Sequence, residues 1–181
     1  MARTRRQSHV GHMGVDPQDF RTGMRRLAAG VSLVASTWNG EPWGLAATAV
    51  CSVSASPPML LACVNRKASA HEAIRSSGFL SVNVLAAADR ELAVAFSSGG
   101  HPHARFRHGS WSSLSTGAPI LTTALVAFDG RIAQVVDAAT HAIFVTEVLA
   151  IRAGAQSDPL IYADAGYGSV RTLMEIDRAD H

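Results

Sequence analysis

The order of apolar and polar residues predicts short strands separated by turns, and residues 44–69 show this most clearly. Two strands meet at Pro57-Pro58, because proline cannot donate a ladder hydrogen bond. The apolar run 59–64 predicts a strand buried on both faces, followed by the polar loop 65–69. On the first strand, one face carries small hydroxyl groups that leave the backbone open to a flat, hydrogen-bonding ligand. That face holds Thr48, Val50, Ser52 and Ser54, and the opposite face holds Ala47, Ala49, Cys51 and Val53.

The chain before this stretch predicts a tail, a helix and a hairpin. Residues 1–15 are polar, basic and without periodicity, which predicts a disordered tail before a domain at 16–181. Asp16 is placed to cap a helix with Pro17 at its first position. The apolar face of this helix comprises Phe20, Met24, Leu27 and Ala28, and Gly30 is predicted to end it. A strand at 31–37, a tight turn at Asn39-Gly40 and a return strand at 45–54 then form a hairpin.

The rest of the chain alternates strands with short helices. Ser69 and Glu72 have the spacing of a capping box, which opens a helix that stops at Gly78. Residues 97–115, rich in glycine, histidine and serine, predict an exposed excursion, and Asp129-Gly130 predicts a tight turn. Strands are predicted at 79–85, 124–128, 131–136 and 141–151, and a further short helix at 89–96.

Six or so strands with turns between them favour an antiparallel barrel or sandwich, so the fold class is mainly β. There is no alternating strand–helix rhythm, no Gly-x-Gly-x-x-Gly after a strand and no phosphate-loop motif. A nucleotide, if it binds, is not held in the manner of a doubly wound fold.

Composition narrows the function classes. The 181 residues are 48% apolar and 17% charged with a net charge of +2, which predicts one globular domain and gives no reason to expect nucleic acid. No apolar run reaches about 18 residues, and the N-terminal arginines precede no apolar segment. We therefore expect no membrane span, no signal peptide and a cytoplasmic location. Cys51 and Cys63 are interpreted as free, buried residues within strands, although a disulfide between neighbouring strands is not excluded.

Several combinations of reactive residues in the sequence do not predict a metal or catalytic site. His101-x-His103 has no acidic or thiol ligand nearby, so no metal site is predicted. A Gly-x-Ser-x-Gly elbow for a hydrolase is absent, so no catalytic side chain is assigned. His71 is predicted to lie on the surface of its helix. His141 is predicted at the mouth of a strand, where the simpler interpretation is a solvated turn residue.

The loop 65–69 supports two interpretations. Arg66 and Lys67, the only lysine, supply positive charge, Ser69 supplies a hydroxyl group, and the start of the helix supplies free amides, as at a phosphate site. Alternatively, Ser69 is only a helix cap and both cations are solvated. On pattern alone the whole stretch 44–69 also fits an ordinary core hairpin with a solvated loop.

With these residues in view, the sequence resembles the flavin reductase family, NAD(P)H:flavin oxidoreductases that serve two-component flavin-dependent monooxygenases. The resemblance runs from about residue 20 to about residue 170. Its marks are the segments 47–54, Pro57-Pro58, 65–69, 78–85, 117–119, 140–144 and 159–162.

The resemblance implies a six-stranded Greek-key split barrel with short flanking helices, forming a homodimer. It implies that FMN or FAD lies along the first strand and that NADH or NADPH binds against it. His141 would meet the nicotinamide, although the family usually has glycine two residues earlier, where this chain has Ala139. The cofactor-binding residues implied are Thr48, Ala49, Val50, Ser52, Asn65, Arg66, Lys67, Ser69, Asn83, His141, Tyr162 and Tyr167.

The resulting hypothesis is an enzyme that reduces flavin with NAD(P)H and releases it, reduced and diffusible, to a partner oxygenase that hydroxylates an aromatic substrate. The protein needs no acid or base of its own for this, because the cofactors carry the chemistry. The main alternative is a non-catalytic flavin-binding electron carrier or sensor on the same barrel. A more distant one is a pyridoxamine-phosphate oxidase on a similar barrel.

Overall fold

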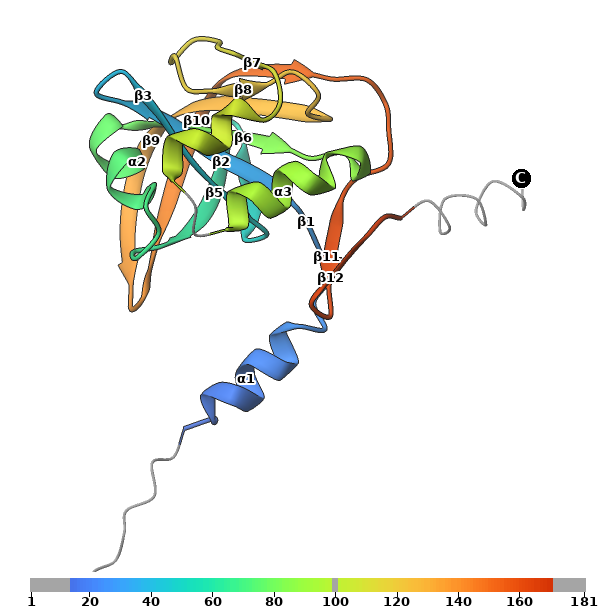
Figure 1. Cartoon of the computed structure of the whole chain (residues 1–181). Coiled ribbons are helices and arrows are strands. Elements are labelled where there is room, and N and C mark those ends of the chain that lie inside the picture. Colours follow the sequence, from blue (N-terminus) through green and yellow to red (C-terminus); the bar gives the residue numbers. More distant parts are fainter. Residues whose placement is uncertain (1–13, 99–100, 171–181) are drawn as a thin grey trace, which may run out of the picture.

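Seven antiparallel strands, in the order β3-β2-β6-β9-β10-β5-β4, form the body of the protein (Figure 1). The computed structural model describes residues 14–98 and 101–170, so most of the predicted tail at 1–15 and the end of the chain lie outside the described residues. These strands are β2 (Ser32–Trp38), β3 (Glu41–Ala47), β4 (Val50–Ala55), β5 (Pro58–Asn65), β6 (Phe79–Val84), β9 (Val126–Ala138) and β10 (His141–Ala153). The predicted mainly β, antiparallel barrel is confirmed.

Smaller elements cover and extend this sheet. Two small sheets hold β1 against β11 and β12, and β7 against β8. The short strands are β1 (Ala29–Gly30), β7 (Trp111–Ser112), β8 (Ile120–Leu121), β11 (Ile161–Ala163) and β12 (Gly166–Gly168). The helices are α1 (Pro17–Met24), α2 (His71–Ser77) and α3 (Arg90–Ser97), with 3-10 turns η1 (Ala87–Asp89) and η2 (Pro102–Arg107).

The strand predicted at 45–54 is in fact two strands. The chain leaves β3 at Ala47 and enters β4 at Val50, and these two strands form opposite edges of the seven-stranded sheet. Residues 48–49 therefore carry the chain across the seam of the barrel, and the Ala49 carbonyl accepts a hydrogen bond from the amide of Cys63 at 2.9 Å. The extra strand raises the count from the six expected to seven.

The face pattern predicted for residues 47–54 is also wrong. The register shifts between Ser52 and Ser54, as at a β-bulge, so the two faces do not alternate regularly along β4.

Cys51 is exposed rather than buried, Cys63 is half-buried, and both are free thiols. Burial raises the pKa of the Cys63 thiol, and nearby Cys51 raises it further. The prediction that the strand at 59–64 is buried on both faces is also wrong. Along β5 buried residues alternate with half-buried ones, so one face is buried and the other is partly exposed to solvent.

Residues 126–138 form one long strand, which overturns the tight turn predicted at Asp129-Gly130. Asp129 is fully buried and accepts hydrogen bonds from the backbone and hydroxyl groups of Thr116. A Cβ atom on Gly130 would lie 2.5 Å from the Glu147 carbonyl oxygen of β10, so glycine here permits close approach of two strands. The actual turn is Ala139-Thr140, with Ala139 at a φ of 50°.

Two other local predictions differ in extent. The helix capped by Asp16 ends at Met24 rather than at Gly30, and Gly30 belongs to β1. The described residues of the segment 97–115 are less exposed than predicted. The rings of Phe106 and Trp111 pack on the buried ring of Phe96, with centroid distances of 5.0 and 5.7 Å. This packing brings η2 over the barrel next to α3.

The core has two parts. One cluster lies under α3 and the C-terminal strands and includes Leu33, Phe96 and Leu160, and the other lies under α2 and includes Val64, Ile74 and Phe144. Both α2 and α3 thus bury an apolar face on the barrel. No helix in the described part of the chain is long and apolar enough to cross a membrane.

Candidate functional site

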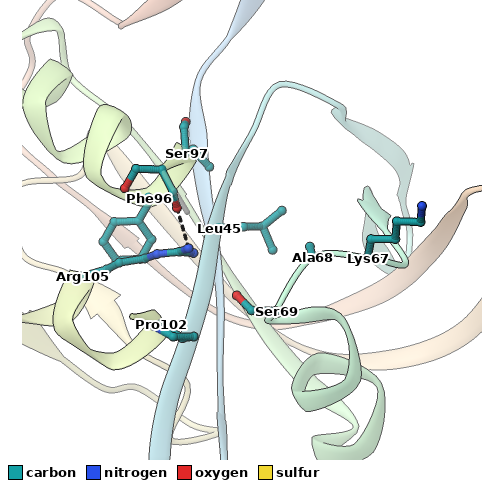
Figure 2. Close-up of a pocket in the computed structure, with 10 residues that line it drawn as sticks. Leu45, Lys67, Ala68, Ser69, Phe96, Ser97, Pro102 and Arg105 are labelled. Atoms are coloured by element: carbon teal, nitrogen blue, oxygen red, sulfur yellow. Dashed lines mark hydrogen bonds between the residues drawn. The ribbon is translucent and has the colours of Figure 1, made fainter. Parts of the chain in front are cut away.

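A cavity of about 550 Å³ opens between β3 and the turn that follows β5 (Figure 2). Leu45 and Ala46 of β3 form one wall, and the end of α3 and η2 form another. This volume lies within the roughly 300–1,000 Å³ typical of small-molecule sites. The remaining lining residues are Lys67, Ala68, Ser69, Phe96, Ser97, Ser98, Pro102 and Arg105.

The Ser69 hydroxyl is available to a ligand because Ser69 does not cap α2. The helix begins at His71, its cap position is Ala70, and no side chain bonds to its first turn. Glu72, the expected partner in a capping box, accepts a hydrogen bond from Ser76 instead. The predicted capping box is therefore wrong, and Ser69 is an exposed lining residue of the cavity.

Arg105 supplies a fixed positive charge to this cavity. Its guanidinium donates hydrogen bonds to the carbonyl oxygens of Gly44 at 3.1 Å and Ser98 at 2.6 Å. These bonds tie η2 to β3 and to the end of α3, so the charge is held in place (Figure 2). Arg105, Ser97, Ser98 and Pro102 were not predicted from the sequence as site residues. The apolar residues Phe106 and Trp111 could have indicated that the segment after α3 packs on the barrel.

A second cavity of about 310 Å³ adjoins the first, since Ala46 and Ser97 line both. Thr48, Tyr162 and Tyr167 also line it. The two tyrosine rings pack edge to face with centroids 5.2 Å apart, and β11 and β12 hold them side by side. The structure thus brings Thr48 and both predicted tyrosines together, next to the larger cavity.

A third cavity of about 400 Å³ lies on the other side of Lys67. Asn65, Arg66 and Lys67 line it from one side, and the turn residues Ala139 and Thr140 line it from the other. The predicted anion loop is therefore divided: Lys67 reaches two cavities, Arg66 one and Ser69 the other. The Asn65 side chain shapes the loop by accepting a hydrogen bond from the Lys67 amide at 2.9 Å.

His141 stands at the first position of β10, exposed and paired across the sheet with Asn65. Its Nδ1 lies 2.9 Å from the Thr140 hydroxyl, at the edge of the third cavity. The tyrosine pair lines the second cavity, so within one chain the structure does not bring His141 and the tyrosines to the same cavity.

Three predicted site residues lie elsewhere. Val50 and Ser52 line a separate apolar cavity of about 240 Å³ with Phe128 and Ile151. Asn83 is fully buried, donates to the carbonyl oxygens of Leu33 and Pro119, and accepts from the amide of Leu121. Its amide is satisfied by the protein, which indicates a structural role between β2, β6 and β8 rather than the pocket-lining role expected.

His71 is buried rather than exposed as predicted, with its ring 5.8 Å from that of Phe144. It packs α2 onto β10 directly after the loop 65–69. Among the described residues, no group of three or more His, Cys, Asp or Glu side chains is arranged to hold a metal ion.

Comparison with known proteins decides the family. A family model described as "Flavin reductase like domain" matches residues 24–171. The chain belongs to the flavin reductase family. Among its relatives in this family is an FMN reductase (NADH), RutF 2, of Rhizobium rhizogenes strain K84, which is 42% identical over 153 residues, covering 84% of this chain and 88% of that protein.

Solved flavin reductases share the fold. Flavin reductase PheA2 superposes with a TM-score of 0.78 at 28% identity, covering 86% of this chain and 98% of that one. BorF, the flavin reductase component of a bacterial two-component tryptophan halogenase, has a TM-score of 0.79 at 29% identity, covering 85% and 98%. The predicted family is therefore confirmed.

Proposed function

We propose that this chain reduces free flavin at the expense of NADH. One observation carries the proposal: a cavity of about 550 Å³, with the hydroxyl of Ser69 and the guanidinium of Arg105 at its walls, in a chain of the flavin reductase family. Relatives about 40% identical are named FMN reductase (NADH), which supports FMN and NADH as the pair of substrates.

The residues present fit a flavin phosphate and ring. Ser69, Lys67 and Arg105 would hold the phosphate, because a hydroxyl group and cations give charge-assisted hydrogen bonds to it. Leu45 and Ala46 of β3 would lie beside the ring, and the small side chain of Ala46 leaves the backbone there accessible. Thr48, Tyr162 and Tyr167 would enclose the nicotinamide in the adjoining cavity. The chemistry itself, hydride transfer from nicotinamide C4 to flavin N5, belongs to the two substrates, so the chain contributes their relative position.

The purified protein tests this directly. Given NADH, FMN and oxygen, it should oxidise NADH and produce hydrogen peroxide at a rate independent of added phenols. Catalase should return part of the oxygen consumed. The absence of turnover with any free flavin would leave the non-catalytic flavin carrier as the better interpretation.

The phosphate assignment has its own test. Lys67→Ala combined with Ser69→Ala should weaken FMN binding by about tenfold or more, the usual effect of losing charge-assisted bonds, and leave riboflavin binding unchanged. Arg107→Ala, which removes an exposed arginine of η2 that does not line the cavity, serves as the control. An equal loss for riboflavin would reject the assignment.

We further propose that the reduced flavin diffuses to a partner oxygenase acting on an aromatic substrate, in the cytoplasm where NADH is available. BorF supports this, since its name describes it as a component of a two-component tryptophan halogenase. An oxygenase held behind a dialysis membrane should still turn over when this protein and NADH are on the other side. A homodimer and use of NADPH remain part of the proposal, and the exposed apolar face of α1 supports the dimer.

A further inference from the structure

The two cysteines of the chain lie on the neighbouring strands β4 and β5, and neither has a role in the function proposed above. Cys51 lies opposite Leu61 in the register of these strands. The amide of Cys63 donates a hydrogen bond to the carbonyl of Ala49 at 2.9 Å, so Cys63 is the diagonal neighbour of Cys51. Residues offset by two in an antiparallel pair share one face of the sheet. The two thiols therefore lie next to each other on the same face.

The two thiols differ in their access to solvent. Cys51 is exposed and lines the apolar cavity of about 240 Å³ with Met59 and Ile151, whereas Cys63 is half-buried. Besides burial, the nearby Cys51 raises the pKa of the Cys63 thiol, as expected for two sulfur atoms close together. An oxidant in solution therefore reaches Cys51 first, and Cys63 is placed to supply the second sulfur atom.

The strand that carries Cys51 is held on one side only. Among the described strands, β4 pairs with β5 alone and forms an edge of the seven-stranded sheet. Its register shifts between Ser52 and Ser54, directly after Cys51, and such a bulge bends the strand that contains it. Diagonal neighbours have Cα atoms about 7–8 Å apart, whereas a disulfide needs about 4.4–6.8 Å, so β4 has to approach β5 by about 1–2 Å. A bulged edge strand can make a shift of this size.

We propose that Cys51 and Cys63 are a peroxide-sensitive pair that closes to an intramolecular disulfide. The oxidant is hydrogen peroxide, which the proposed function generates when reduced flavin meets oxygen. The Cys51 thiolate attacks one peroxide oxygen and the O–O bond breaks, leaving a sulfenic acid and a hydroxide that takes up a proton to become water. The Cys63 sulfur then attacks the Cys51 sulfur, its thiol proton is transferred to the departing hydroxyl group, and a second water leaves. The two thiols lose two electrons in total, and these reduce the peroxide to water.

Treatment of the whole protein with hydrogen peroxide, without flavin or NADH, tests the proposal by mass spectrometry and thiol titration. The wild-type protein should lose the mass of two hydrogen atoms and both titratable thiols, and a digest should contain one peptide pair that links Cys51 to Cys63. Dithiothreitol should restore both thiols. Cys51→Ser and Cys63→Ser, each with one thiol left, are matched controls and should form no internal link. Phenylarsine oxide, which bridges two neighbouring thiols, should bind the reduced wild type and neither variant.

Several results would overturn the inference. Oxidation of Cys51 to a sulfinic acid while Cys63 stays a thiol would show that β4 does not approach β5. A disulfide between two copies of the chain on a non-reducing gel, or two thiols that survive excess peroxide, would reject the pair as well. Because peroxide is added directly, these results do not depend on flavin reduction by the chain. With NADH, FMN and oxygen in place of added peroxide, the same link should form and catalase should prevent it; turnover without the link would reject the assigned oxidant.

Discussion

His141 is exposed at the tip of the β9–β10 hairpin, with the Thr140 hydroxyl 2.9 Å from its Nδ1. Ala139, which precedes this pair, adopts a φ of 50° that favours glycine, so the turn forms at some cost in backbone strain. The turn nevertheless closes a two-residue hairpin, with His141 opposite Ala138. The substitution of glycine by alanine in this position therefore leaves the placement of His141 at the strand mouth intact.

His141→Ala should raise the KM for NADH by about tenfold, which corresponds to about 1.4 kcal/mol, and leave the FMN dissociation constant unchanged. The family resemblance implies a contact of His141 with NADH, whereas the tyrosines line a different cavity, so the test also decides whether His141 takes part in NADH binding. Steady-state kinetics at saturating FMN, with a parallel flavin titration, give both values. His108→Ala, at another exposed histidine, is the control. Loss of flavin binding with an unchanged KM would mean that His141 serves the flavin instead.

At the scale of elements, α2 is attached to the β9–β10 hairpin at both of its ends. Buried His71 packs on Phe144 of β10 at the start of the helix. Near its end, Arg75 makes two hydrogen bonds to Asp137 of β9. The loop 65–69 and the His141 turn are therefore held in one unit, which positions both walls of the third cavity.

The Arg75–Asp137 pair should make stability depend on pH in the acid range. The hydrogen bond from Arg75, followed by its charge, lowers the pKa of Asp137 below its ordinary 3.8. A carboxyl group with a depressed pKa in the folded state stabilises the protein above its unfolded pKa, and the contribution is lost as the pH falls through the folded value. The difference in unfolding free energy between wild type and Asp137→Asn should thus be present at neutral pH and be lost as the pH falls below 3.8 and through the depressed pKa.

Denaturant unfolding between pH 2.5 and 7 measures this difference. Because both side chains are solvent-accessible, added salt should shrink it at neutral pH. Glu91→Gln, at an exposed acid with no ion pair among the described residues, provides a comparison. A difference that persists unchanged into strong acid would show that the substitution acts through packing.

Local signals predicted some of these elements well. Asn39-Gly40 forms the expected turn with positive φ at both residues, Gly78 ends α2 in the left-handed conformation, and Asp16 caps α1. Asp129-Gly130 failed as a turn because burial of the carboxylate and close strand approach, both tertiary effects, override local propensity. The break after Ala47 has no local signal, because it arises from closure of the barrel.

Only the part of the site that has a local signal in the sequence was predictable. Lys67 and Ser69 could be proposed because charge and hydroxyl groups cluster in one loop, and Thr48 because it follows a strand of small residues; all three line cavities. Arg105 could not be found from sequence spacing, because it reaches the cavity from η2. It bonds to the carbonyl of Gly44 in β3, about 60 residues earlier in the chain. Val50 and Ser52 line a different cavity from Thr48, because the break and the bulge change the faces of β4.

At the scale of the whole molecule, the described part of the chain leaves α1 uncovered. None of its residues is buried, and the apolar face predicted from the sequence is open, with Phe20 61%, Met24 48% and Leu27 63% exposed. The helix stands away from the barrel (Figure 1), joined near its end by the Arg25 carbonyl to the amide of Asp164. An eight-residue helix is marginal in water on its own, so a second copy of the chain is the proposed partner for this face.

Phe20→Asp should therefore weaken self-association at least tenfold, because it places a charge in the apolar contact. Thr22→Asp adds the same charge on the opposite face of α1 and should leave the assembly unchanged. Sedimentation velocity over a dilution series measures both, with circular dichroism to confirm folding. A wild-type protein that is monomeric at every concentration would contradict the proposal.

The chain crossing at residues 48–49, between the two edges of the sheet, has a consequence for the resistance of the protein to proteolysis. Flavin in the proposed site would contact β3, at one edge of the sheet, and the turn after β5, the strand next to the other edge. It would therefore hold together two ends of the sheet that are not paired with each other. A ligand that binds only the closed form raises the cost of opening it. Backbone amides of residues 45–49 should accordingly exchange hydrogen more slowly when FMN is added. Proteases would cut the flavin-free protein faster than the flavin-bound protein. The cellular abundance of this reductase would therefore follow the concentration of flavin, its own substrate.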